Sequence, residues 1–165
     1  MRKQSWVAVL AAAALCLAFA GPAAAKDPVR PFGGTATVGV ETEGPPTGCS
    51  PGAMGRDTFV AQGQLLHLGR SSLMGAQCMY LDPATGAGSM DHGAMTITAA
   101  NGDTLYLAYH GTFRLYPWPN PEVMLDVAIF WQATGGTGRF AHATGAGNVG
   151  VTEAETLLFS GTIAY

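Results

Sequence analysis

The sequence has few charged side chains, and more of them are acidic than basic. Only 12% of the 165 residues are Asp, Glu, Lys or Arg, and 8 basic residues stand against 11 acidic ones. Hydrophobic residues make up 48% of the chain, so this composition argues against a charge-rich disordered protein. The shortage of basic residues predicts that nucleic acid is not a partner.

Several patterns that carry common chemistry are also missing. No two cysteines have the Cys-x-x-Cys spacing of a redox centre or zinc site, and no serine lies in a nucleophile elbow. Residues 136–141 superficially match a dinucleotide fingerprint. That motif needs a helix directly after the turn, and glycines 145, 147 and 150 disfavour one. The sequence therefore predicts no nucleotide cofactor.

The first 25 residues have the layout of a secretory signal peptide. Arg2 and Lys3 precede an apolar run over residues 6–20, and an alanine-rich site predicts cleavage between Ala25 and Lys26. A membrane-spanning helix needs about 20 apolar residues, and this run is shorter. We therefore predict a periplasmic or secreted protein that consists of residues 26–165 and has no membrane anchor after processing.

Two cysteines, Cys49 and Cys78, remain after this cleavage. An even number of cysteines in an oxidising compartment favours a disulfide, here predicted between these two residues. The alternative is that both are small buried hydrophobic residues that never meet.

The mature chain has the pattern of an all-β protein. No segment keeps a 3.6-residue period, whereas apolar and polar residues alternate over short stretches that Gly, Pro, Asn or Asp interrupt. Eight strands in one domain favour an eight-stranded antiparallel β-barrel, because closure removes exposed edges; a two-sheet sandwich is the alternative. The predicted strands are 33–43, 57–69, 71–80, 88–99, 103–115, 122–133, 139–150 and 154–164.

The fifth and sixth strands suggest a particular hairpin register. Odd positions are apolar in both strands, and the polar groups fall mainly on even positions. Opposite charges and aromatic pairs stabilise neighbouring strands when they face each other. A hairpin centred on Trp118 gives three such pairs, which are Arg114 with Glu122, His110 with Asp126, and Tyr106 with Phe130.

The C-terminal third carries a family resemblance. Residues 136–140 read Gly-Thr-Gly-Arg-Phe, glycines 145 and 147 follow, and the chain ends with Phe-Ser-Gly-Thr-Ile-Ala-Tyr. Together with the turns at 99–103 and 109–112, this layout resembles small secreted bacterial proteins of the allene oxide cyclase barrel-like fold, which are related in shape to plant dirigent proteins. The resemblance implies an eight-stranded barrel with an apolar cavity, often in a homo-oligomer. It transfers no catalytic residue.

His110 and Asp126 are the best catalytic candidates, because a neighbouring carboxylate orients an imidazole and raises its pKa. If their face lines the barrel, an isomerase or cyclase acting on a hydrophobic substrate is the corresponding function. If it faces outward, these residues form a solvated polar stripe. Four further side chains are candidate ligand contacts, which are Tyr106, Arg114, Phe130 and Trp118, the last either as a lid or folded back on its turn.

Met90, His92 and Met95 form a candidate metal site. Thioethers beside an imidazole suit Cu(I), and the stretch is similar to the Met- and His-rich repeats of periplasmic copper-handling proteins. Here the motif occurs once, and Met90 and Met95 would point to opposite faces of a regular strand. Copper is therefore the one cofactor considered, and ordinary strand packing is the alternative.

The function favoured by these observations is non-catalytic. We expect an exported barrel that binds a small apolar or amphipathic molecule or serves structural assembly, because such pockets are mostly apolar with few polar groups. The isomerase or cyclase and the copper-binding protein are the alternatives.

Overall fold

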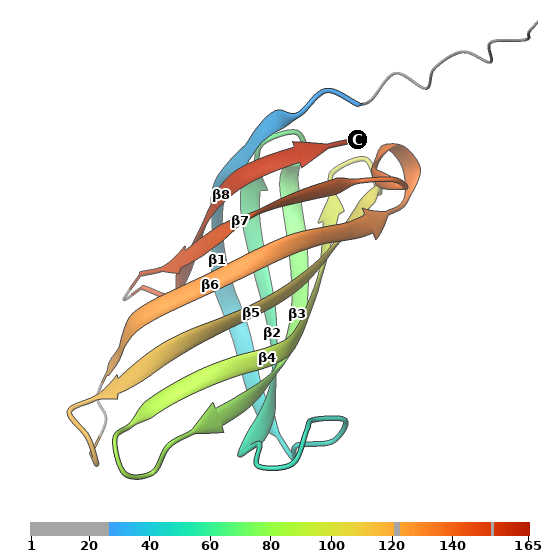
Figure 1. Cartoon of the computed structure of the whole chain (residues 1–165). Coiled ribbons are helices and arrows are strands. Elements are labelled where there is room, and N and C mark those ends of the chain that lie inside the picture. The colour runs from blue at the N-terminus through green and yellow to red at the C-terminus, as the bar shows by residue number, and fades with distance from the viewer. Residues whose placement is uncertain (1–26, 121–122, 153) are drawn as a thin grey trace, which may run out of the picture.

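The computed structural model describes residues 27–120, 123–152 and 154–165, with the backbone alone at 123–125. Eight strands follow one another in chain order around a closed antiparallel barrel, as Figure 1 shows. A short 3-10 helix, η1 (Gly138–Phe140), lies between the sixth and seventh strands. The strands are β1 (Arg30–Gly44), β2 (Gly55–Leu65), β3 (Gly69–Leu81), β4 (Ala87–Ala99), β5 (Thr104–Tyr116), β6 (Val123–Gly136), β7 (Thr144–Val151) and β8 (Thr156–Ala164).

The predicted all-β barrel is confirmed, and the sandwich alternative is wrong. The strand predicted over 139–150 begins later, at Thr144, because residues 138–140 coil into η1. The strand predicted over 57–69 ends earlier, at Leu65, because residues 66–68 form the turn, and β3 begins at Gly69. His67 takes a positive φ of 68° in that turn. The signal peptide and its cleavage site between Ala25 and Lys26 lie outside the described residues.

Closure of the barrel is confined to one half of its length. β8 pairs with β1 only from Arg30 to Thr37, and β7 pairs with β6 only from Ile129 to Ala133. β1 continues to Gly44 along β2, and β6 begins at Val123 along β5. Figure 1 shows β7 and β8 covering only the upper part of the molecule. The lower edges of β1 and β6, residues 39–44 and 123–128, border what we call the open flank.

The closed half is filled by inward-pointing side chains. Trp131 is 2% exposed and packs edge-on against Phe32, with ring centroids 5.1 Å apart. Its indole N–H donates to the backbone oxygens of Asn148 and Ser160, each at 3.2 Å. The ring lies over the paired Gly147 and Gly161, where a Cβ atom would collide with it. Alternating apolar residues therefore build a packed core rather than an open lumen in this half.

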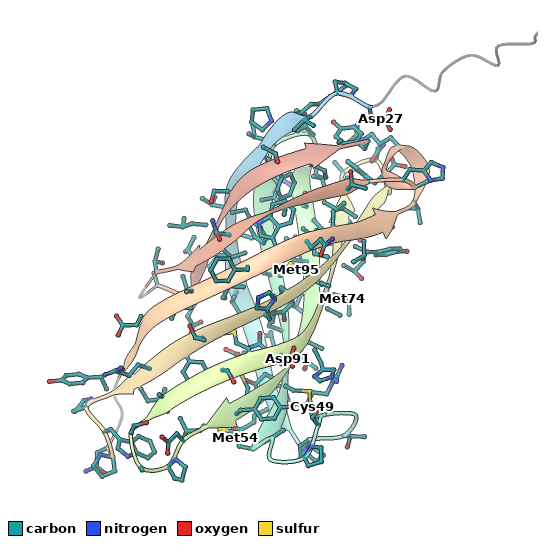
Figure 2. The ribbon with its side chains drawn as sticks, in the orientation of Figure 1. Asp27, Cys49, Met54, Met74, Asp91 and Met95 are labelled. Atoms are coloured by element: carbon teal, nitrogen blue, oxygen red, sulfur yellow. A yellow bond between two sulfur atoms is a disulfide. The ribbon has the colours of Figure 1, made fainter. Side chains whose placement is uncertain are left out.

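The predicted disulfide is confirmed. Cys49 and Cys78 are bonded with their Cα atoms 5.7 Å apart, so the loop after β1 is tied to β3 (Figure 2). Cys78 is fully buried. A disulfide of this kind is typical of proteins in a non-reducing compartment.

We expect Gly147→Ala to destabilise the barrel by about 1–3 kcal/mol, because the new methyl group would overlap the Ser160 carbonyl oxygen and the Trp131 ring. Gly39→Ala is the matched control, since its Cβ would meet only the Val60 carbonyl oxygen at 3.9 Å. Urea denaturation measures both variants. Equal stabilities would contradict this account of the core.

The double variant Cys49→Ala/Cys78→Ala should lose about 3 kcal/mol, because the unfolded chain regains the freedom of the loop that the bond closes. Denaturant curves of this variant and of the reduced wild-type protein should agree. A variant as stable as the oxidised wild type would show that the bond adds nothing to the fold.

Candidate functional site

The even positions of β5 from Tyr106 to Arg114, and those of β6 from Ala128 to Thr134, lie on the outer wall of the barrel. His110 faces Phe130 instead of Asp126, and Arg114 faces Leu125. The predicted register, in which His110 faces Asp126 and Tyr106 faces Phe130, is therefore wrong. Glu122, the predicted partner of Arg114, lies outside the described residues.

The position of the hairpin and a β-bulge together explain the altered register. Tyr116 pairs with Val123, so the hairpin is not centred on Trp118 and the partners lie three residues further along β6 than predicted. The bulge adds one more residue. Between the pairs Thr112–Ala128 and Arg114–Leu125, β6 has one residue more than β5, and Asp126 takes a positive φ of 52° there. A bulge of this kind shifts every pair beyond it. Regular alternation, on which the predicted register rests, contains no such insertion.

The two predicted catalytic residues have separate contacts. His110 stacks on Phe130 with ring centroids 5.8 Å apart. Asp126 Oδ2 lies 3.8 Å from Arg114 Nε, and both of these side chains are largely exposed. In the described part of the chain, no hydrogen bond or ion pair joins His110 to a carboxylate. The pair that would activate a base is thus not assembled.

A second bulge separates the members of the candidate copper site. Met90 pairs with Gly111 and Gly93 with Tyr109, so Asp91 and His92 together oppose one residue of β5. This extra residue reverses the alternation, and Met90 and Met95 both point into the core, 4% and 6% exposed. The expectation that they point to opposite faces is therefore wrong.

His92 remains on the other side of the wall from these two methionines. Its φ is 52°, its side chain is 48% exposed, and its Nδ1 lies 3.6 Å from Asp91 Oδ2. Asp91 and Met95 are labelled in Figure 2. Among the residues that the structure describes, no group of three or more His, Cys, Asp or Glu side chains is arranged to hold a metal ion.

The β4 bulge brings His92 next to His110, and together they border a hollow that we call the outer groove. It has a volume of about 360 Å³ and crosses β4 to β7. The methyl groups of Ala108 and Ala146 leave room at its floor, since these residues and Gln132 form one cross-strand row. Its lining comprises Asp91, His92, Gly93, Ala108, Tyr109, His110, Phe130, Trp131, Gln132 and Ala146.

A second hollow, the apolar hollow, lies on the outer wall over β1 to β4. Its volume is about 320 Å³. Val40, Val60 and Met74 face one another across β1, β2 and β3, and they are 61%, 40% and 65% exposed. Contiguous exposed apolar patches are a common feature of contact sites.

Three carboxylates gather on the inner face of the open flank, and we call them the inner acidic cluster. Glu43 on β1 faces Asp57 on β2, and Glu41 faces Phe59, a residue of the core. The bulge at Gly39 places them there, because it shifts the pairing from Val38–Ala61 to Val40–Val60. Glu41 and Glu43 remain accessible from solvent.

The pKa values of this cluster reflect its crowding. Partial burial raises the pKa of the Glu41 carboxyl, and the charges of Asp57 and Glu155 raise it further. Burial also raises the pKa of Asp57, the charge of Glu43 adds to this, and a hydrogen bond from Gln77 opposes it. Like charges that share a partly dry surface disfavour ionisation of one another.

Tyr109 borders the same cluster from within the core. Its hydroxyl donates to the Ala76 carbonyl oxygen at 3.1 Å. Burial raises the pKa of this phenol, the nearby Asp57 and Glu41 charges raise it further, and Arg56 opposes them. Tyr109 therefore stays a neutral hydrogen-bond donor at physiological pH.

Sequence reasoning did not identify the inner acidic cluster. The signal was present in Glu41 and Glu43, which alternate at the end of the predicted strand 33–43, and in Asp57 at the start of the next. Strand alternation places the first two on one face, but only the Gly39 bulge decides that this face is the inner one.

Trp118 is folded back on a neighbouring turn. Its indole N–H donates to the Pro83 carbonyl oxygen at 3.0 Å, and its ring lies against Gly86. Of the other candidate ligand contacts, Tyr106 and Phe130 are exposed on the outer wall, 39% and 51%. Only Phe130 and His110 of the predicted β5–β6 residues border the outer groove.

No family model, curated protein or solved structure matches this chain. The resemblance to the allene oxide cyclase barrel-like and dirigent-like proteins thus stays a prediction from the sequence. Among the described residues, no helix has the length and apolar character needed to cross a membrane.

The raised pKa values of Glu41 and Asp57 predict a pH dependence. A carboxyl with a raised pKa binds its proton more readily in the folded chain, so the fold gains stability as pH falls through the raised pKa toward the ordinary value and loses it as pH rises again. Hydrogen bonds lower the pKa of Asp82, so this carboxylate stabilises the fold at neutral pH. That stabilisation is lost only as pH falls below the ordinary value of 3.8, outside the range of the Glu41 effect.

Glu41→Gln should therefore raise the melting temperature at pH 7, and the difference from wild type should shrink toward pH 4.5, the ordinary pKa of the carboxyl. Thermal unfolding followed by circular dichroism from pH 7 to 4.5 measures this. Asp27→Asn removes an exposed carboxyl near the N-terminal end of β1 and should leave the curve unchanged. A lower melting temperature for Glu41→Gln at pH 7 would contradict the prediction.

Proposed function

We propose that this is an exported, non-catalytic barrel protein that binds a small amphipathic molecule in the outer groove. The observation that carries the proposal is the position of the hollows. The interior of the closed half is occupied by the protein's own side chains, whereas the outer groove is open and about 360 Å³ in volume. This volume lies near the lower end for small-molecule sites, which span about 300–1,000 Å³.

The lining of the outer groove suits a molecule with an apolar body and a polar end. The Phe130 ring and the methyl groups of Ala108 and Ala146 offer an apolar surface. The Gln132 amide and the two imidazoles of His92 and His110 offer hydrogen bonds at its border. An aromatic ring with a polar substituent would stack on Phe130 and reach these groups.

The separate contacts of His110 and Asp126 favour binding over the predicted catalysis by this pair. A general base must reach the proton that it removes, and in the predicted pair the carboxylate would orient the imidazole and raise its pKa. His110 instead packs against a phenylalanine, and Asp126 is engaged by Arg114. An isomerase or cyclase that uses these two residues would require a different side-chain arrangement.

Export to the periplasm or cell exterior rests on the signal-peptide pattern before Lys26 and on the Cys49–Cys78 disulfide. The bond accords with a compartment in which thiols are oxidised. The ligand would therefore be a molecule encountered outside the cytoplasm.

Structural assembly is the second candidate, and the apolar hollow favours it. Val40, Val60 and Met74 expose adjoining apolar side chains on the outer wall, away from the outer groove. Two copies that meet through this surface would bury them. Native mass spectrometry of the purified protein distinguishes a homo-oligomer of this kind from a monomer with a retained small molecule.

The test of the groove uses 8-anilinonaphthalene-1-sulfonate, an amphipathic aromatic probe, and compares its fluorescence titration of wild type and Phe130→Ala. We expect the substitution to weaken binding about three- to tenfold, because a stacked aromatic pair contributes about 0.5–1.5 kcal/mol.

Met74→Ala is the matched control, since it removes a similarly exposed side chain from the apolar hollow. It should leave the affinity for the probe unchanged. The proposal fails if Phe130→Ala binds the probe as wild type does, or if Met74→Ala is the variant that loses binding.

A further inference from the structure

The lower edge of β1 is a strand edge without a neighbour. Residues 39–44 pair with β2 on one side, while β8 ends its pairing with β1 at the Thr37–Thr156 pair. Glu155, the residue before β8, closes the row by accepting the Val38 N–H at 3.0 Å. In the described part of the chain, no further strand continues that row. The six-residue edge is about 20 Å long.

Such an edge is a template for an added strand. Extended peptides bind exposed sheet edges through main-chain hydrogen bonds, and the pockets that receive alternate side chains supply specificity. Here the alternate side chains of a strand laid along β1 would point toward the inner face of the open flank, next to Glu41 and Glu43.

The charges on that inner face indicate which kind of peptide the edge would bind. Glu41, Glu43 and Asp57 lie together, and Glu155 stands close enough to Glu41 to raise its pKa. Of the arginines, Arg56 is placed opposite Cys78 on the other face of the sheet, and its Nη1 lies 3.9 Å from Cys78 Sγ. The cluster thus presents several negative charges, which favour the binding of cationic side chains at the open flank.

The same charges disfavour a second copy of this chain. If two β1 edges met antiparallel, Glu41 and Glu43 of one copy would lie beside those of the other. Like charges on directly opposed strand residues are destabilising, and inward-pointing charges are a common device against edge-to-edge pairing. Repulsion of an identical edge and attraction of a basic strand follow from the same carboxylates.

We propose that the open flank binds an extended basic peptide segment, which adds as a strand antiparallel to residues 39–44 of β1 and directs alternate Lys or Arg side chains toward Glu41 and Glu43. The segment continues the line of β8 and so extends the barrel wall toward β6. This inference is independent of the outer groove, because it uses none of the groove's residues.

The test uses a fluorescein-labelled heptapeptide, Thr-Lys-Val-Lys-Val-Lys-Thr, whose lysines fall on alternate positions. Fluorescence anisotropy at low ionic strength measures its binding to the mature protein. Two control peptides of the same length separate the contribution of charge from that of main-chain hydrogen bonds. One carries Glu in place of each Lys, and the other keeps the lysines but is N-methylated at every backbone amide, which removes its hydrogen-bond donors. We expect only the unmodified basic peptide to bind.

Glu41→Gln and Glu43→Gln should each weaken this binding about three- to fivefold, the effect of losing one solvent-accessible ion pair. Asp27→Asn removes one charge far from the open flank, near the start of β1 (Figure 2), and should bind as wild type does. Hydrogen exchange followed by mass spectrometry should show new protection in residues 39–44 when the peptide is bound.

Equal binding of the N-methylated peptide would overturn the proposal, because strand addition would then be unnecessary. The proposal would also be overturned if both Glu variants bound the peptide as tightly as wild type does. The same holds if residues 39–44 gained no protection from hydrogen exchange and other residues did. Native mass spectrometry should show one peptide per chain. A dimer that fails to bind the peptide would show that a second copy occupies the edge instead.

Discussion

Closure of this barrel depends on its two shortest strands. β7 has 8 residues and β8 has 9, whereas β1 to β6 have between 11 and 15. The pairing of β8 with β1 therefore seals only one half of the wall, and that half contains the Trp131 core. In the other half, β1 and β6 continue with a strand on one side only among the described residues, and polar groups on the inner face of β1 remain accessible. The difference in strand length thus divides the molecule into a packed end and an open end.

Bulges determine which residues face each side of the wall. The extra residues at Gly39, at Asp91–His92 and at Asp126 each reverse the alternation of the strand that carries them. The first turns two glutamates inward, the second places two methionines on the same inner face, and the third displaces the β5–β6 pairing beyond it by one residue. Bulges commonly redirect side chains near functional sites. Both regions proposed for binding lie next to one.

The fold was largely predictable from the sequence, since apolar alternation and turn residues identify eight strands and a closed barrel. The disulfide was predictable for a simpler reason, because Cys49 and Cys78 are the two cysteines beyond the predicted signal peptide. The β5–β6 register was not, because Tyr116 pairs with Val123 and the hairpin is therefore not centred on Trp118, and because nothing local marks the positive φ of Asp126 at the bulge. His92 also has a positive φ at a bulge, and nothing in the neighbouring sequence marks it. Where regular alternation holds, as at His110 and Phe130, the shared face was predicted correctly. Where a bulge intervenes, as at Met90 and Met95, it was not.

The bond between Cys49 and Cys78 also has a consequence for maturation. Cys78 stands opposite Arg56 on the side of β3 that the preceding loop covers, so the two sulfur atoms are neighbours only when β2 and β3 pair as they do here. A slip of one residue would turn Cys78 toward the lumen and leave the wall between the thiols. Oxidation of the two thiols therefore fits the observed alignment of this hairpin, and the bond, once formed, locks that alignment in place.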